Sequence, residues 1–156
     1  DGGNAFGNEL LGAGRISTIN TDSFEDFCAL LWSKQGYSRT MRTPRAGDGG
    51  VDVIAIRGKN GVVIQCKSSS IQGREHGWEA VKDVSAGVAA YAARYQGVSF
   101  KMVAATNQRF NGTARSQAAV LHVELIDGTG LAALLVEHPI KRGELECFLL
   151  AGWNST

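Results

Sequence analysis

Three polar side chains with the chemistry for phosphodiester hydrolysis fall on a predicted strand hairpin: Asp52, Gln65 and Lys67. Side chains of a strand alternate between its two faces, so Gln65 and Lys67 share one face of an otherwise apolar strand. A lysine at that place needs an anionic group nearby, and Asp52, at the start of the preceding strand, supplies one. The carboxylate and the amide oxygen are hard ligands that suit Mg²⁺ or Mn²⁺, cations that neutralise phosphoryl oxygens during hydrolysis.

The same strand supplies the rest of the predicted centre. The backbone carbonyl of Cys66 would complete the protein's share of the metal ligands. Lys67 would lie beside the attacking water, where it either stabilises the developing charge or helps to remove the water's proton, and the sequence leaves both roles open. The plainer alternative is a structural ion pair between Asp52 and Lys67, with Gln65 as a hydrogen-bonded core amide.

The elements that position these residues can be predicted from periodicity and turn signals. Asp22 and Glu25 have the spacing of a capping box, and apolar residues at helical intervals follow until the next glycine, which predicts a first helix. A strand is expected within residues 37–43. Two β-branched runs, residues 51–57 and 61–67, are separated by a short glycine-containing connection and predict an antiparallel hairpin.

The second half of the chain alternates between helix and strand patterns. Residues 68–77 are polar and are expected to form a loop, after which Trp78 to Tyr95 has a helical period with its apolar side in the core. The segments that follow are a strand at 99–105, a helix at 113–120, a strand at 122–126 and a helix at 129–137. This order predicts a three-layer α-β-α domain with a central mixed sheet of about five strands, in the order αβββαβαβα. Residues 144–153 are apolar, and their pattern favours no element.

The stretch from Gly47 to Lys67 resembles the PD-(D/E)xK nuclease superfamily, and specifically the Mrr-like restriction endonuclease domain. Members of that group carry an Asp after a glycine-rich turn and then Q-x-K in place of acid-x-Lys, as Asp52 and Gln65-Cys66-Lys67 do here. The likeness extends over residues 22–136 in the family's order, and it includes Phe24-Glu25, Thr106 to Phe110, Ala114, Ala118, Leu125 to Gly128 and Leu131.

The resemblance implies a restriction-endonuclease-like core that cleaves DNA with Mg²⁺ or Mn²⁺. It implies a role for Glu25, which the family often places near the metal through a water, although a capping-box acid explains the same residue. Because Gln65 is neutral, we expect modest metal affinity and a single ion. On the helix after Q-x-K the family often carries a polar Gln where Lys82-Asp83 stands here. Relatives are often fused to a target-recognition domain, and neither the target nor pairing into a homodimer can be deduced from this sequence.

The leading functional hypothesis is therefore a metal-dependent DNA endonuclease of the restriction or defence type. Two alternatives keep the same fold. One is a catalytically inactive DNA-binding module that lost metal affinity through Gln65, and the other is a structure-specific nuclease that cuts junctions.

Four residues near the predicted centre are candidates for substrate contact: Arg45, Ser68, Ser69 and Asn107. Arg45 ends a run from Lys34 that has four cations and no acid, which is typical of either a phosphate-binding surface or a solvated face. The two serines directly follow the Q-x-K strand. Asn107 follows a buried strand, where α/β proteins often place functional loops. A polar loop and a helix cap are the corresponding structural explanations.

The composition is typical of one globular domain: 156 residues, of which 44% are hydrophobic and 20% charged. The formal net charge is +1, so contact with DNA must depend on a local surface. The three cysteines have no paired spacing, and no apolar run approaches the roughly 20 residues of a membrane span, so we expect a cytoplasmic protein with no membrane contact. Residues 1–20 are expected to be a loose lead-in, and residues 21–156 a single nuclease domain.

Overall fold

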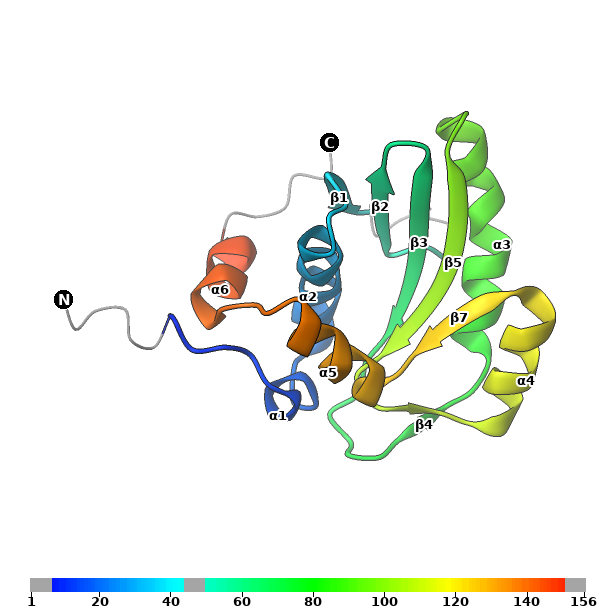
Figure 1. The fold of residues 1–156 in the computed structure, drawn as a ribbon. Coiled ribbons are helices and arrows are strands. Elements are labelled where there is room, and N and C mark those ends of the chain that lie inside the picture. Colours follow the sequence, from blue (N-terminus) through cyan, green and yellow to red (C-terminus); the bar gives the residue numbers. More distant parts are fainter. Residues whose placement is uncertain (1–6, 44–49, 151–156) are drawn as a thin grey trace.

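A mixed five-stranded sheet forms the centre of the molecule, as the sequence predicts (Figure 1). The structure is a computed structural model, and it describes residues 7–43 and 50–150. The sheet has the order β1-β2-β3-β5-β7. Its strands are β1 (Arg39–Arg42), β2 (Val53–Arg57), β3 (Asn60–Lys67), β5 (Ser99–Thr106) and β7 (Val123–Ile126).

The first three strands are antiparallel, and the last three are parallel. The predicted hairpin of β2 and β3 is confirmed, with Arg57 opposite Asn60 across a two-residue turn. Gly58 has a φ of 60° there, and such short hairpin turns need a residue with positive φ. The parallel pairs require long crossovers, which the helices between these strands provide.

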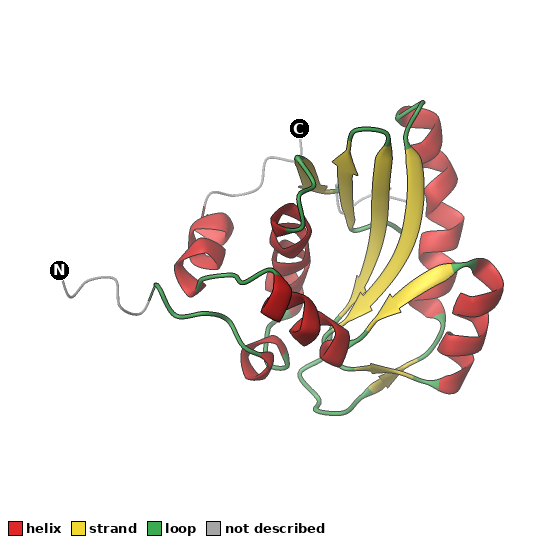
Figure 2. Cartoon of the chain, viewed as in Figure 1, coloured by secondary structure: helices red, strands yellow, loops and turns green. Residues whose placement is uncertain are grey.

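Helices cover both faces of the sheet, which gives the expected three layers (Figure 2). On one face, Val62, Ile64 and Cys66 of β3 pack with α2 and α5, and on the other, Val63 packs with α3 and α4. This confirms the predicted alternation of faces along β3. The helices of the three layers are α2 (Thr21–Lys34), α3 (Glu79–Arg94), α4 (Gly112–Leu121) and α5 (Gly128–Glu137).

The first long helix begins two residues earlier than the capping box predicts. Its N-cap is Asn20, whose side chain accepts a hydrogen bond from the backbone N–H of Ser23 at 2.8 Å, while Asp22 lies in the first turn. Asparagine is among the best N-cap residues, so it satisfies a helix donor that the Asp22 pattern would have left to an acid. Glu25 is consequently free of a capping role.

Part of the expected N-terminal lead-in is packed against the core. Helix α1 (Ala13–Ile16) buries Ile16, and Leu11 is 9% exposed with its N–H bonded to the carbonyl of Ile140 at 2.9 Å. The segment whose pattern favoured no element, residues 144–153, overlaps helix α6 (Arg142–Leu150), which packs on α2. These short segments have too few apolar residues for a periodic pattern. Their packing is thus determined by contacts with segments that are distant in the sequence.

A second, very small sheet joins two segments expected to lie in loops. Strand β4 (Glu75–His76) pairs in parallel with β6 (Arg109–Phe110). Two residues per strand cannot show an alternation in sequence. Nearby, Trp78 is 38% exposed at the start of α3, so the expectation that it lies in the core is wrong.

Candidate active site

The hairpin brings Asp52 against the middle of the Q-x-K segment. Strand β2 pairs with β3 only as far as Ile64, so the last three residues of β3 extend past it. The N–H of Cys66 donates to Oδ2 of Asp52 at 2.9 Å, and the N–H of Asp52 donates to the carbonyl of Ile64 at 2.8 Å. The carboxylate thus lies beside the backbone between Gln65 and Lys67, as the sequence predicted.

Gln65 carries an unusual polar atom. The residue is 7% exposed, and its Oε1 is buried with no hydrogen-bond partner among the described residues. The large majority of buried side-chain polar atoms in proteins are paired, and an unpaired one costs about 1–3 kcal/mol. The structural alternative, a hydrogen-bonded core amide, has no donor for this oxygen among the described residues. The geometry therefore fits an oxygen that is kept open for a ligand.

Lys67 lies at the end of β3 next to helix α3. Its Nζ is 3.9 Å from Oδ2 of Asp83, and both side chains are about one third exposed, at 34% and 37%. Gly50 lets the turn before Asp52 approach this helix, because its φ is 91° and a Cβ there would lie 2.5 Å from the carbonyl oxygen of Asp83. Asp83 thus belongs to the site's surroundings, although the sequence only marked its helix as different from the family pattern.

Glu25 faces a cation of the protein itself. Its carboxylate pairs with Arg42 of β1, which also reaches Asp26 at 3.2 Å. Burial alone would lower the pKa of Arg42, but the carboxylates of Asp26 and Glu25 outweigh burial and raise this pKa. The role of Glu25 near a metal stays a prediction, and in the structure Glu25 holds β1 against α2.

The buried thiol of Cys66 is affected by the charges of both acids of the predicted centre. The pKa of Cys66 is raised well above its usual value, first by the hydrogen bond with the thiol of Cys28, then by burial and by the negative charges of Asp52 and Glu25. Both carboxylates therefore act on the same side chain from different elements. Cys66 stays a neutral thiol, so its backbone and not its sulfur is suited to a role in the site.

The residues expected to contact substrate lie in different surroundings. Ser68 donates from its hydroxyl to Thr21 at 3.1 Å, and it is half-buried like Ser69. Asn107 is 3% exposed, and its amide exchanges hydrogen bonds with both backbone groups of Ser69 at 3.0 Å each. It thereby positions the loop that follows Lys67. Arg45 lies outside the described residues.

The basic run from Lys34 to Arg45 is engaged internally wherever it is described. Lys34 pairs with Glu144, and Arg39 lies over the ring of Tyr95 with its guanidinium carbon 5.7 Å from the ring centre. Together with the pairing of Arg42, these contacts favour a structural explanation for this part of the run.

His76 is a neighbour of the centre that the sequence did not identify. Burial and the positive charges of Arg74 and Lys67 lower its pKa, while Glu79 opposes the shift. Its Nε2 is buried without a hydrogen-bond partner in the part of the chain that the structure describes. Because only the unpredicted pairing of β4 with β6 brings this histidine close to Lys67, its sequence position gave no signal.

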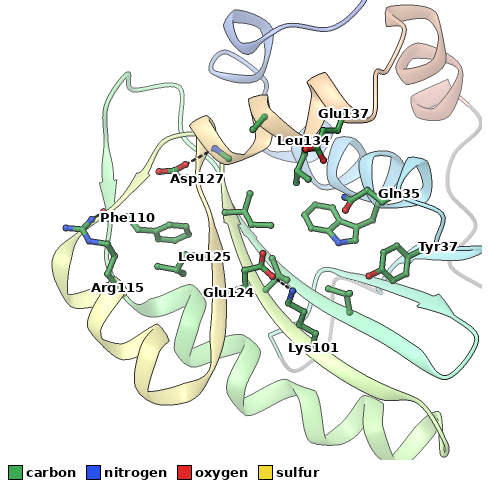
Figure 3. A pocket seen from close by; sticks show the side chains of 16 residues that line it. Gln35, Tyr37, Lys101, Phe110, Arg115, Glu124, Leu125, Asp127, Leu134 and Glu137 are labelled. Carbon is green, nitrogen blue, oxygen red and sulfur yellow. Dashed lines mark hydrogen bonds and ion pairs between the residues drawn. The ribbon is translucent and has the colours of Figure 1, made fainter.

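One pocket of the described surface is separate from the predicted centre. A pocket of about 480 Å³ opens between α2, α5 and β7, and Figure 3 shows Lys101 and Glu124 paired within it. Asp127, also at its wall, caps helix α5 by accepting from Gly130 at 2.9 Å. None of the residues predicted for catalysis lines this pocket.

Among the described residues, no group of three or more His, Cys, Asp or Glu side chains could hold a metal ion. The predicted ligand set contains only one side chain of those types, Asp52, and otherwise uses an amide oxygen and a backbone carbonyl. A set of this kind, with a single negative charge, fits a weakly held hard cation that keeps most of its water ligands. No helix in the described ranges combines the length and apolar character that a membrane crossing requires.

The mixed sheet, its two helical layers and the acid, amide and lysine on neighbouring strands define an α/β domain of the restriction-endonuclease-like type. Solved structures share this fold. A protein of unknown function, AF1548, matches with a TM-score of 0.62 and 20% identity, over 76% of this chain and 66% of that one. The MspJI restriction endonuclease, solved in complex with a 27-mer oligonucleotide, matches with a TM-score of 0.53 and 24% identity, over 83% of this chain. The chain spans 31% of the length of MspJI.

The chain belongs to the Mrr_cat restriction endonuclease family, whose model matches residues 16–135. The match includes every described residue predicted for the centre, from Glu25 to Asn107, and it confirms the resemblance drawn from the sequence. No curated protein matches the chain.

Proposed function

We propose that this domain is an endonuclease that hydrolyses DNA phosphodiester bonds with Mg²⁺ or Mn²⁺. One observation carries the proposal: the buried oxygen of Gln65 has no partner in the described chain, and it lies on the strand segment that the carboxylate of Asp52 contacts and that ends in Lys67. A packing role for Gln65 leaves this oxygen unexplained, whereas a metal ligand needs it open.

Asp52, Gln65 and the backbone carbonyl of Cys66 are the groups that would hold the metal. The cation would supply charge neutralisation at the phosphoryl oxygens and a more acidic water. The chain's own contribution is placement: β3 fixes the spacing of the amide and the carbonyl, and the hydrogen bond from Cys66 orients the carboxylate. With one anionic side chain, the site is suited to a single ion of modest affinity.

Lys67 would stabilise negative charge on the scissile phosphate. Its ammonium is one third exposed and has Asp83 3.9 Å away, so a phosphate could share it without the cost of uncovering a buried charge. Glu25 would act at a greater distance, through a water, and its pairing with Arg42 keeps it fixed toward the sheet. Arg45, Ser68 and Ser69 are proposed phosphate contacts, and Asn107 would act by positioning Ser69.

Restriction or defence is the proposed biological role, with the domain acting in the cytoplasm on DNA. The family match favours this role, and MspJI is a much longer chain that was solved with an oligonucleotide. We propose that a fused or separate unit selects the target. Cutting of both strands would follow from pairing into a homodimer.

The test is cleavage of a supercoiled plasmid with Mg²⁺ or Mn²⁺, with EDTA as the negative control. Asp52→Asn retains an oxygen that can accept from Cys66 but removes the charge, and Lys67→Ala removes the ammonium. Each should reduce the rate at least about 100-fold. Lys101→Ala is the matched control, because Lys101 lies on neighbouring β5, is 61% exposed and pairs with Glu124. Unchanged cleavage in the first two variants would rule out the proposed centre.

Substrate choice and binding decide between the two alternatives predicted from the sequence. A junction nuclease would cut a branched substrate much faster than a linear duplex of the same sequence. An inactive DNA-binding module would bind the duplex in a salt-dependent manner and leave the plasmid intact in either metal.

A further inference from the structure

The loop of residues 68–74, which follows Lys67 directly, carries one exposed apolar residue that does not contribute to the hydrophobic core. Ile71 is 60% exposed, and it belongs to neither hydrophobic cluster of the described core. Its neighbours along the loop are serines, a glutamine, a glycine and an arginine. An exposed isoleucine is common on protein surfaces, so the surrounding structure must decide whether it has a role.

Buried amide side chains fix the position of the loop. Besides the bonds that Asn107 makes to Ser69, the side chain of Gln108 donates to the carbonyls of Ser17 at 3.0 Å and Ser69 at 2.8 Å. Its Oε1 accepts from the N–H of Gly73 at 3.0 Å. Gln108 is 6% exposed, so a buried amide is used to fix an exposed loop. Such anchoring lowers the entropy lost when the loop binds a partner.

The loop and helix α1 adjoin, in two segments that carry cations and no acid and that have Glu9, Asp22 and Glu75 directly beyond their ends. The side chain of Gln72 donates to the carbonyl of Ser17 at 3.3 Å, and Figure 1 shows α1 and the loop before β4 side by side. Residues 10–21 and 66–74 contain Arg15, Lys67 and Arg74 but no Asp or Glu. Exposed cations with many hydroxyl and amide groups are the composition that contacts a phosphate backbone.

Chain geometry places this surface next to the proposed reaction. Ile71 is four residues beyond Lys67, so their Cα atoms are at most about 14 Å apart, roughly four steps of a DNA duplex. A duplex whose phosphate lies at Lys67 therefore passes within reach of the loop. A rigid polar loop with a single apolar tip fits a groove, where apolar contact with base edges complements contacts to the backbone.

We propose that the 68–74 loop and α1 form a DNA-docking surface, and that Ile71 enters a groove of the duplex beside the scissile phosphate. This inference rests on the proposed nuclease function. Arg15 and Arg74 contact phosphates on this surface, and the amides of Asn107 and Gln108 keep Ile71 in the orientation that the groove requires.

Binding of a fluorescent duplex in EDTA, where no metal-dependent cleavage occurs, tests the surface by itself. Ile71→Ala should weaken binding about tenfold, the order expected when an aliphatic contact is truncated at an interface. Arg74→Ala should lower the dependence of log K on log salt by about 0.9, the value of one phosphate contact. Val136→Ala is the control, since Val136 is 81% exposed on α5. The melting temperature should stay unchanged in the Ile71 and Val136 variants.

Photocrosslinking locates the contact. A benzophenone side chain at position 71 should crosslink to bases within one helical turn, about ten base pairs, of the mapped cut, whereas the same group at position 136 should not. Binding unaffected by Ile71→Ala, or equal crosslinking from both positions, would overturn the inference while leaving cleavage by the centre intact. Weaker binding by Ile71→Ala in a protein that never cleaves would uphold the surface and reject the nuclease.

Discussion

Replacing Gln65 with leucine should stabilise the metal-free protein and remove its activity. Leucine has a similar volume and no buried oxygen, so the variant avoids the cost of about 1–3 kcal/mol for the unpaired Oε1. Repacking around the branched leucine side chain offsets part of this gain, at about 1 kcal/mol. We expect a net increase of about 1 kcal/mol in the free energy of unfolding.

Gln108 provides the matched control, because it is buried to the same degree, at 6% against 7% exposed. Its amide makes three hydrogen bonds, of 3.0, 2.8 and 3.0 Å. Gln108→Leu should therefore lower the free energy of unfolding by about 3 kcal/mol, at about 1 kcal/mol for each lost bond. The same substitution at two buried glutamines is thus expected to change stability in opposite directions.

Urea unfolding of both variants in EDTA measures these differences, with circular dichroism as the signal. The titration is then repeated with Mg²⁺. Wild-type protein should gain about 1.4 kcal/mol at a metal concentration ten times Kd, while the Gln65→Leu variant should gain none. If the Gln65→Leu and Gln108→Leu variants lose similar stability in EDTA, the Gln65 oxygen is paired without metal, and the argument for a ligand position fails.

Two further predictions concern groups near the centre. The pKa of His76 is lowered from its usual 6.5 by burial and by neighbouring cations, so its imidazole is neutral in the folded protein at neutral pH. The stability that depends on this neutral state should be fully present above pH 6.5 and should fall as the pH drops through the lower folded pKa. NMR titration of His76 measures this pKa, and a value at or above 6.5 would contradict the prediction. Cys28 and Cys66 are buried and Cys147 is exposed, so a thiol reagent should label one cysteine in the native protein and three in urea; rapid native labelling of a second thiol would contradict the assigned burial.

Local periodicity in the sequence was sufficient to predict the strands around the candidate site. It did not predict the neighbours that other segments of the chain bring to that site. The alternation around Gln65 and Lys67 depends only on the pleat of one strand, and the short turn at Gly58 fixes the pairing partner. The position of Asp52 could be predicted as well, because the same hairpin determines which residues of β3 it contacts. The positions of His76 and Asp83 near the site depend on contacts between distant segments, and no periodic pattern in the sequence predicts these contacts.

The expected substrate contacts show the same limit in another form. Asn107 follows a strand end, a position shared by residues that bind ligands and by residues that hold loops. Only the three-dimensional structure separates the two, since the amide of Asn107 is buried and bonded to both backbone groups of Ser69. Likewise, a basic run is identified from composition, whereas the pairing of Lys34 with Glu144 requires α6 to lie on α2.

The centre exists because two strands of a hairpin differ in length. Strand β3 continues for three residues after β2 stops pairing with it, so the N–H of Cys66 would lack an acceptor on that side if Asp52 did not supply its carboxylate. The same hydrogen bond that completes the sheet also fixes the acid next to the amide of Gln65. Asp52 therefore serves both the fold and the site. The packing of the apolar clusters on both faces of the sheet offsets the free-energy cost of leaving the Gln65 oxygen without a partner in the described chain. A substitution that extended the regular pairing of β2 with β3 past Ile64 is therefore expected to stabilise the sheet and to abolish the site.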